Sequence, residues 1–171
     1  MTPLHAALGG GAELIVWRLD RAKYGGAWAS GEGARVAGAR WNSPGTPVVY
    51  CSLDPATTIL EKAVHVGFTA LDRVPHVLTS MLIDAPKSAH VVQPSELPRA
   101  DWLEAGTPNA AQQAFGDALL AAHAFVVLPS VVSRRSWNML FNPLRAAGHF
   151  ALVKQEGFVL DGRLHMGGAR S

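Results

Sequence analysis

The chain has little of what usually holds a metal ion or stabilises a secreted protein. Cys51 is the only cysteine among 171 residues, so no disulfide can form within the chain, which favours a reducing compartment. None of the seven histidines lies three or four residues from another, so the helical pairs that ligate zinc are absent. We therefore expect no metal site and no required cofactor.

Long apolar runs are also missing. The longest apolar stretches, such as residues 125–128, fall far short of the roughly 20 residues that a membrane-spanning helix needs. The first residues carry no Lys or Arg before a mild apolar stretch, unlike a secretory signal. We expect a cytoplasmic protein without membrane contact.

Charge is sparse and scattered. Charged residues make up 16% of the chain against 49% hydrophobic residues, and the formal net charge is +2. The largest basic concentration is the pair Arg134 and Arg135, which is less than the clustered basic face of a nucleic-acid-binding protein. We expect one folded domain at residues 13–171 behind a flexible Gly- and Ala-rich arm at residues 1–12, with no direct nucleic-acid binding.

Strand and helix patterns alternate irregularly along the domain. Runs rich in β-formers predict strands at residues 14–19, 47–51, 76–84, 89–92, 125–128, 150–154 and 158–160, the last two paired around Gly157. Helices are predicted from Asp54-Pro55 to about Gly67 and from an Asn109 cap to residue 122, while residues 25–38 are predicted to form a glycine-rich loop. The mixed order predicts an α+β fold.

The two predicted helices each carry an apolar face. In the first, the buried stripe is predicted to be Ala56, Ile59, Leu60, Ala63 and Val64, which leaves Glu61 on a polar flank with Thr57, Thr58 and His65. In the second, the face is predicted to be Ala111, Phe115, Ala118, Leu119 and Ala122. By periodicity alone Glu61 is a solvated glutamate.

Common nucleotide and hydrolase motifs do not fit. Residues 31–36 begin like a dinucleotide-binding fingerprint, but Val36 stands where its third glycine belongs. No phosphate-binding loop ending in Gly-Lys-Ser/Thr is present, and no Gly-x-Ser-x-Gly elbow presents a nucleophilic serine.

Several longer strings are more specific. Residues 30–35 (SGEGAR) and 38–50 (GARWNSPGTPVVY), Leu60-Glu61, residues 127–132 (VLPSVV), Trp137-Asn138 and Asn142-Pro143 resemble, in order and spacing, the RES-domain toxins. Ala39 departs from the family pattern, in which a second glycine is usual, and residues 144–147 (LRAA) replace a commoner acidic stretch.

This resemblance implies a fold similar to the ADP-ribosyltransferases, with a split, mostly antiparallel β core and flanking helices. It implies the toxin of a type II toxin–antitoxin system that cleaves the nicotinamide–ribose bond of NAD by hydrolysis or phosphorolysis. It also implies an Xre-like antitoxin that blocks the active site.

The resemblance also implies roles for particular residues. Glu61 is the carboxylate expected to stabilise the oxocarbenium-like ribose, with Arg40 and Ser130 as its catalytic companions. Ser130 is expected to hydrogen-bond the ligand or to fix Glu61. The residues expected to bind NAD are Arg18, Arg40, Tyr50, Trp41, Asn42 and Asn142.

Two alternatives stay open. The first is a mono-ADP-ribosyltransferase that modifies a cellular protein, because the acceptor is chosen at the rim of such a site rather than at the NAD-cleaving centre. The second and weaker alternative is a non-catalytic basic binding module.

Overall fold

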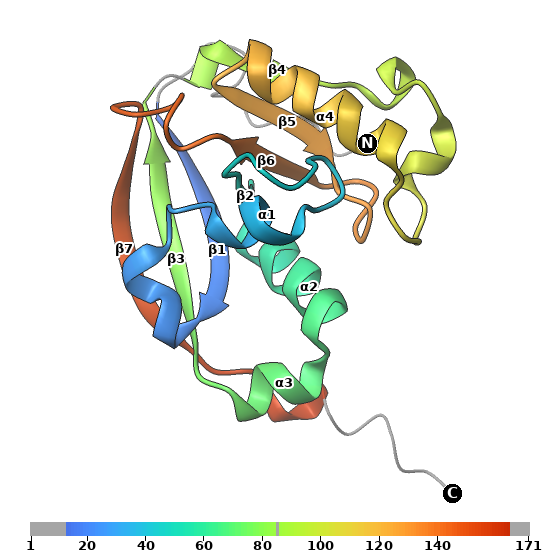
Figure 1. Cartoon of the computed structure of the whole chain (residues 1–171). Coiled ribbons are helices and arrows are strands. Elements are labelled where there is room, and N and C mark those ends of the chain that lie inside the picture. Colours follow the sequence, from blue (N-terminus) through green and yellow to red (C-terminus); the bar gives the residue numbers. More distant parts are fainter. Residues whose placement is uncertain (1–12, 85, 165–171) are drawn as a thin grey trace, which may run out of the picture.

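A computed structural model describes residues 13–84 and 86–164 (Figure 1). The arm predicted at residues 1–12 lies outside this part of the chain. Within it, no helix is long and apolar enough to cross a membrane.

The described chain forms seven strands, four α-helices and several short 3-10 turns. The strands are β1 (Leu14–Arg21), β2 (Val49–Ser52), β3 (His76–Ile83), β4 (Ala89–Val91), β5 (Phe125–Pro129), β6 (Trp137–Phe141) and β7 (Phe150–Phe158). The α-helices are α1 (Glu32–Ala37), α2 (Pro55–Val66), α3 (Phe68–Arg73) and α4 (Ala110–Ala122). The 3-10 turns are η2 (Ala22–Ala27), η3 (Pro86–Ser88), η4 (Pro94–Glu96) and η5 (Ala100–Leu103).

All seven strands belong to one sheet, in the order β4-β5-β6-β2-β1-β3-β7. Every neighbouring pair is antiparallel except β4 and β5, which are parallel. Strands β1 and β2 share the single register pair Trp17 and Ser52, whereas β1 pairs with β3 along its whole length. The two halves of the sheet diverge from this narrow junction, with α2 beside it (Figure 1). The predicted α+β fold with a split, mostly antiparallel core is confirmed.

Apolar side chains pack on both faces of the sheet. One cluster spans the junction and contains Leu14, Val16, Val49, Cys51, Met81, Ile83, Phe125, Val127, Trp137, Met139, Phe141 and Ala146. A second lies under α4 and η5 and contains Trp41, Val48, Val92, Leu97, Trp102, Leu120, Val126, Leu128 and Leu140. Along β5 and β6, successive residues belong alternately to the first and the second cluster. This alternation determines which β6 side chains lie on the face of the sheet toward α2.

Four elements differ from the sequence prediction. Strand β6 was not predicted, because the polar Asn138 interrupts its apolar pattern. The two predicted late strands are one strand, β7, since Gly157 continues the ladder opposite Val77 instead of turning the chain. Helices α1 and α3 were also missed; each has six residues, too few to show a helical period.

The buried face of α4 is rotated from the predicted one. Its buried residues are Gln112, Gly116 and Leu120, while Phe115 and Leu119 are partly buried. Two contacts turn the helix this way. Gln112 donates a side-chain hydrogen bond to the carbonyl oxygen of Trp102, and Gly116 allows the backbone at Trp41 to approach closely. A polar and a glycine residue therefore face inward, which a count of apolar residues cannot indicate.

Candidate active site

Helix α2 carries Glu61 to the junction of the sheet. Asp54 caps its first turn by accepting hydrogen bonds from Thr57, at 2.8 Å from the backbone nitrogen and 2.6 Å from the hydroxyl. Pro55 at the first helical position suits this cap, as predicted. Thr58 then donates its hydroxyl to the carbonyl oxygen of Trp17 at 2.8 Å, which fixes the helix against β1.

The predicted apolar stripe of α2 is confirmed only in part. Ala63 is buried and Ile59 packs against the core, but Leu60 and Val64 are 37% and 67% exposed. Thr57 and Thr58 are buried instead. Hydroxyls can face inward here because Asp54 and the Trp17 carbonyl accept their protons, so no buried donor is left unpaired. The face predicted to be a polar flank is therefore the face toward the sheet, and Glu61 lies on its border, half-buried.

One oxygen of the Glu61 carboxylate is held by two donors, one just after β5 and one on β6. Ser130, after β5, donates its hydroxyl to Oε1 at 2.7 Å, and Asn138 on β6 donates its side-chain amide to the same atom at 2.6 Å. Ser130 is fully buried and its Oγ also accepts the backbone N–H of Ser133 at 3.0 Å. Among the described residues, none donates a hydrogen bond to Oε2. The carboxylate is thus oriented through one oxygen, with the other available to a ligand.

Arg40 lies on the loop between α1 and β2. Its guanidinium donates to the backbone carbonyls of Trp102 and Glu104 at 3.4 Å and of Gly106 at 3.0 Å. Partial burial lowers the pKa of Arg40, and the negative charge of Glu61 opposes that shift. The structure therefore brings Arg40 within electrostatic reach of Glu61, where a guanidinium has donors left for an anionic ligand.

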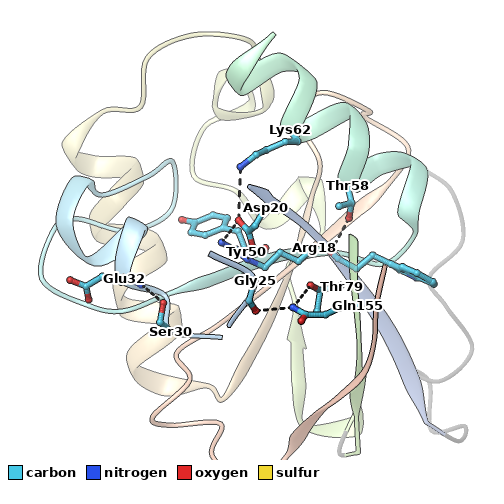
Figure 2. Close-up of polar contacts among 11 residues, drawn as sticks. Arg18, Asp20, Gly25, Ser30, Glu32, Tyr50, Thr58, Lys62, Thr79 and Gln155 are labelled. Atoms are coloured by element: carbon cyan, nitrogen blue, oxygen red, sulfur yellow. Dashed lines mark hydrogen bonds and ion pairs between the residues drawn. The ribbon is translucent and has the colours of Figure 1, made fainter. Parts of the chain in front are cut away.

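Arg18 on β1 is engaged by protein groups. Its Nε and Nη2 donate to the two carboxylate oxygens of Asp20 at 2.5 and 2.9 Å, and its Nη1 donates to the carbonyl of Tyr50 at 2.8 Å (Figure 2). Lys62 on α2 points toward the same carboxylate, at 3.9 Å. Burial lowers the pKa of Lys62, although Asp20 opposes the shift. Sequence reasoning missed Asp20 and Lys62, which no motif singles out.

Tyr50 on β2 is hydrogen-bonded to Trp41 and Asn42, on the loop between α1 and β2. Its hydroxyl donates to Asn42 Oδ1 at 2.8 Å and accepts the backbone N–H of Trp41 at 3.2 Å. Burial raises the pKa of the Tyr50 phenol above its ordinary value, so it remains a neutral donor and acceptor at all working pH values.

Trp41 and Asn42 are both buried in scaffold contacts. The Trp41 ring packs edge-on against Trp102, with centroids 6.3 Å apart. Asn42 has no exposed surface and donates its amide to the carbonyls of Ala34 and Ser43, both at 3.0 Å. Their predicted contact with NAD stays a prediction, and the observed contacts stabilise the loop that carries Arg40.

Asn142 begins the turn after β6. Its side chain accepts the backbone N–H of Leu144 at 2.9 Å, and its carbonyl accepts the N–H of Ala146. Among the described residues, it makes no hydrogen bond to another predicted site residue. The structure therefore groups Glu61 with Ser130 and Arg40, joins Tyr50 to Arg18 and Asn42, and leaves Asn142 in a turn.

Two residues linked to Glu61 were left out of the predicted site: Asn138, which donates to Glu61, and Ser52, which donates to Asn138. Asn138 stood in a string that resembles the RES toxins, so a signal existed. Ser52 had none, because a lone serine after a buried strand carries no pattern. Across residues 13–84 and 86–164, no group of three or more His, Cys, Asp or Glu side chains could hold a metal ion.

Comparison with known proteins places the chain in a family. The family model described as RES domain matches residues 15–166. The chain is 30% identical over 155 residues to "Toxin Res" of Photorhabdus laumondii, covering 88% of this chain and 97% of that protein. It is 30% identical over 132 residues to "Prs ADP-ribosylating toxin" of Sphingobium sp. (strain YBL2), covering 74% of this chain and 81% of that protein.

A solved structure shows the same fold. It is the toxin of the M. tuberculosis MbcT–MbcA toxin–antitoxin complex, with a TM-score of 0.60 and 17% identity, over 86% of this chain and 85% of that one. The family match over nearly all of the described residues, with the 30% identity to the Photorhabdus toxin, establishes that the chain belongs to the RES domain family.

Proposed function

We propose that this chain is a toxin that splits the nicotinamide–ribose bond of NAD. The observation that carries the proposal is the Glu61 carboxylate, which Ser130 and Asn138 hold through Oε1 while Oε2 accepts no hydrogen bond from the described residues. A carboxylate fixed in this way can act on positive charge as it develops, without first reorganising.

Cleavage of the nicotinamide–ribose bond requires only one carboxylate. The nicotinamide of NAD is a pyridinium cation, so the electron pair of the breaking C1′–N bond neutralises it and it leaves without a proton from a general acid. The ribose is left as an oxocarbenium-like cation. Two carboxylates, as most glycosidases use, are therefore not required.

Each residue of the site has a proposed task. Glu61 stabilises the ribosyl cation directly or through a ribose hydroxyl, and Ser130 orients Glu61. Arg40 binds the diphosphate with the donors that the carbonyls of residues 102–106 leave unused. Arg18 acts mainly by holding Asp20 and the Tyr50 carbonyl. Its Nε and Nη2 donate to the Asp20 carboxylate and its Nη1 donates to that carbonyl.

The acceptor of ADP-ribose defines two branches. Transfer to water or phosphate depletes NAD and releases ADP-ribose or its 1-phosphate. Transfer to a protein side chain modifies a target, and the name of the Sphingobium relative, an ADP-ribosylating toxin, supports keeping this branch.

We also propose a protein antitoxin as the partner. The similar fold from M. tuberculosis was solved as a toxin–antitoxin complex. An enzyme that consumes NAD harms the cell that makes it, so the cell needs a partner that covers Glu61 and Arg40 and blocks NAD cleavage. We propose that both act in the cytoplasm, where NAD is available.

A basic binding module has less support. Four arginines pair with neighbouring acids: Arg18 with Asp20, Arg35 with Glu32, Arg99 with Asp101 and Arg163 with Asp161. These pairs neutralise positive charge locally and lie on different elements, so they do not form the single basic face that such a module uses.

The test is to identify what ADP-ribose becomes. Purified protein is incubated with NAD alone, with inorganic phosphate, and with cell lysate, and the products are separated. Free ADP-ribose, its 1-phosphate and labelled protein each select one branch. NAD that stays intact in all three reactions contradicts the proposal.

A further inference from the structure

We infer that Asn138, oriented by Ser52, is a positioning residue that sets the angle of the Glu61 carboxylate for NAD cleavage. This inference rests on the proposed function and adds two residues to it. Neither residue belongs to the predicted site, and both lie on inner strands of the sheet.

The contacts form a chain that starts in the sheet and ends at the carboxylate. Ser52 and Asn138 are register partners on β2 and β6, and the Ser52 hydroxyl donates to Asn138 Oδ1 at 2.7 Å. Asn138 in turn donates its Nδ2 to Glu61 Oε1 at 2.6 Å. Strand β6 lies between β2 and β5, so paired backbone on both sides holds Asn138.

The Ser52 hydroxyl determines which end of the Asn138 side-chain amide faces Glu61. An ionised carboxylate is an acceptor only, so Glu61 needs the N–H side of the amide rather than its oxygen. The buried Ser52 hydroxyl donates to the opposite end of the Asn138 side chain and stabilises that orientation. A flipped amide would place its oxygen against Glu61 and leave the Ser52 proton without this acceptor.

Two donors on one oxygen fix the carboxylate more firmly than one. Ser130 approaches Oε1 from the end of β5 and Asn138 approaches it from β6, so rotation of the carboxylate would break two charge-assisted hydrogen bonds at once. Because Asn138 lies on β6 and the buried Ser130 directly follows β5, Oε2 is held at a set angle toward any ligand above the sheet. Loss of one donor would let the carboxylate turn away from the reacting ribose.

The first experiment separates positioning from binding. Asn138→Leu removes the donor at similar volume, and Asn138→Asp replaces the donor with an acceptor of the same shape. We expect kcat for nicotinamide release to fall about tenfold for Leu and further for Asp, with KM for NAD almost unchanged. Ser52→Ala should lower kcat by only a few-fold, because Asn138 keeps its amide.

Asn109→Asp is the matched control. Asn109 caps α4 by accepting the N–H of Gln112 at 2.9 Å, and aspartate serves this cap equally well. It should leave kcat and KM at the wild-type values. Asn138 variants that keep the wild-type kcat, or that lose activity only through a raised KM, would overturn the inference.

A second experiment tests the contact without using the reaction. Asn138→Asp sets two carboxylates against each other and should lower Tm. Adding Glu61→Gln should restore it, because the glutamine amide can donate to the introduced aspartate. A double variant no more stable than Asn138→Asp alone contradicts the contact. Wild-type protein that leaves NAD intact contradicts the proposed function instead, and the Tm comparison still decides whether Asn138 orients the side chain at position 61.

Discussion

Gly116 on α4 lies so close to Trp41 that a Cβ atom at position 116 would overlap the Trp41 carbonyl oxygen. This approach presses α4 onto the loop that carries Arg40. Gln113 and Asp117 hold the same loop, through hydrogen bonds with the Ala39 carbonyl and with Ser43.

Gly116→Ala is therefore expected to destabilise the fold by about 3 kcal/mol or more, because backbone rather than a flexible side chain blocks the new methyl group. Gly33→Ala is the control, since Gly33 lies in α1 and a Cβ added there would meet nothing within 4 Å. That change should stabilise the chain by about 0.5–1 kcal/mol. Denaturant unfolding of both variants checks the pair, and equal stabilities would show that the close approach is absent.

Arg40→Lys should weaken NAD binding despite keeping the charge. A lysine ammonium cannot reproduce the planar fork, nor can it hold the carbonyls of Trp102 and Gly106 together. Loss of one charge-assisted hydrogen bond predicts a Kd for NAD about tenfold higher. Calorimetry on the folded variant gives the measurement, and an unchanged Kd would assign Arg40 to the scaffold.

His76 should make stability depend on pH. Its Nδ1 lies 2.5 Å from the Val74 carbonyl, while its Nε2 is buried without a hydrogen-bond partner. Burial lowers the pKa of His76, Val74 and Asp20 oppose the shift, and the cations Lys62 and Arg21 add to it. The unfolded chain therefore binds the proton more readily. Stability should be full above a pH of about 6.5 and should fall as the pH drops toward the folded pKa.

His76→Phe removes this titration, so Tm measured from about pH 7.5 down to pH 5 should fall less in the variant than in the wild type. His123 contributes a slope of the same sign, because burial and the neighbours His90 and Arg145 lower its pKa. The difference between the two proteins is thus the relevant quantity. Equal slopes would mean that His76 takes up its proton as easily in the folded chain as in the unfolded one.

An antitoxin and NAD should compete. A partner with an acidic or carboxylate-ended segment would find charge-assisted hydrogen bonds at Arg40, where a diphosphate is proposed to bind. Preformed complex should then bind NAD much more weakly than free toxin, and co-expression should relieve growth inhibition. A complex that cleaves NAD as fast as free toxin would place control in expression or turnover rather than in occlusion.

Local signals in the sequence were enough for parts of this structure. The Asp54-Pro55 cap and the end at Gly67 located α2, and the strings around Arg40 and Ser130 indicated the family and the fold. Hydrophobic periodicity did not predict burial correctly where contacts between residues distant in the sequence determine the packing. Nothing local shows that the Trp17 carbonyl accepts the Thr58 hydroxyl, so Leu60 and Val64 were predicted to be buried where Thr57 and Thr58 are.

The site itself was predicted in part. The expected contact between Ser130 and Glu61 is present, whereas Asn138 was passed over because β6 was not recognised as a strand. Its partner Ser52 becomes visible only through the pairing of β2 with β6, which joins residues 86 apart in the sequence.

The most direct measurement is the initial rate of nicotinamide release from NAD by wild-type protein and Glu61→Gln, with Glu156→Gln as control. The glutamine oxygen can still accept from Ser130 and Asn138, so the fold should persist while the charge that opposes the oxocarbenium is gone. The account predicts a rate at least about 100-fold lower for Glu61→Gln and a wild-type rate for Glu156→Gln, whose side chain pairs with Lys154 on β7. A folded Glu61→Gln variant that releases nicotinamide as fast as the wild type would contradict it.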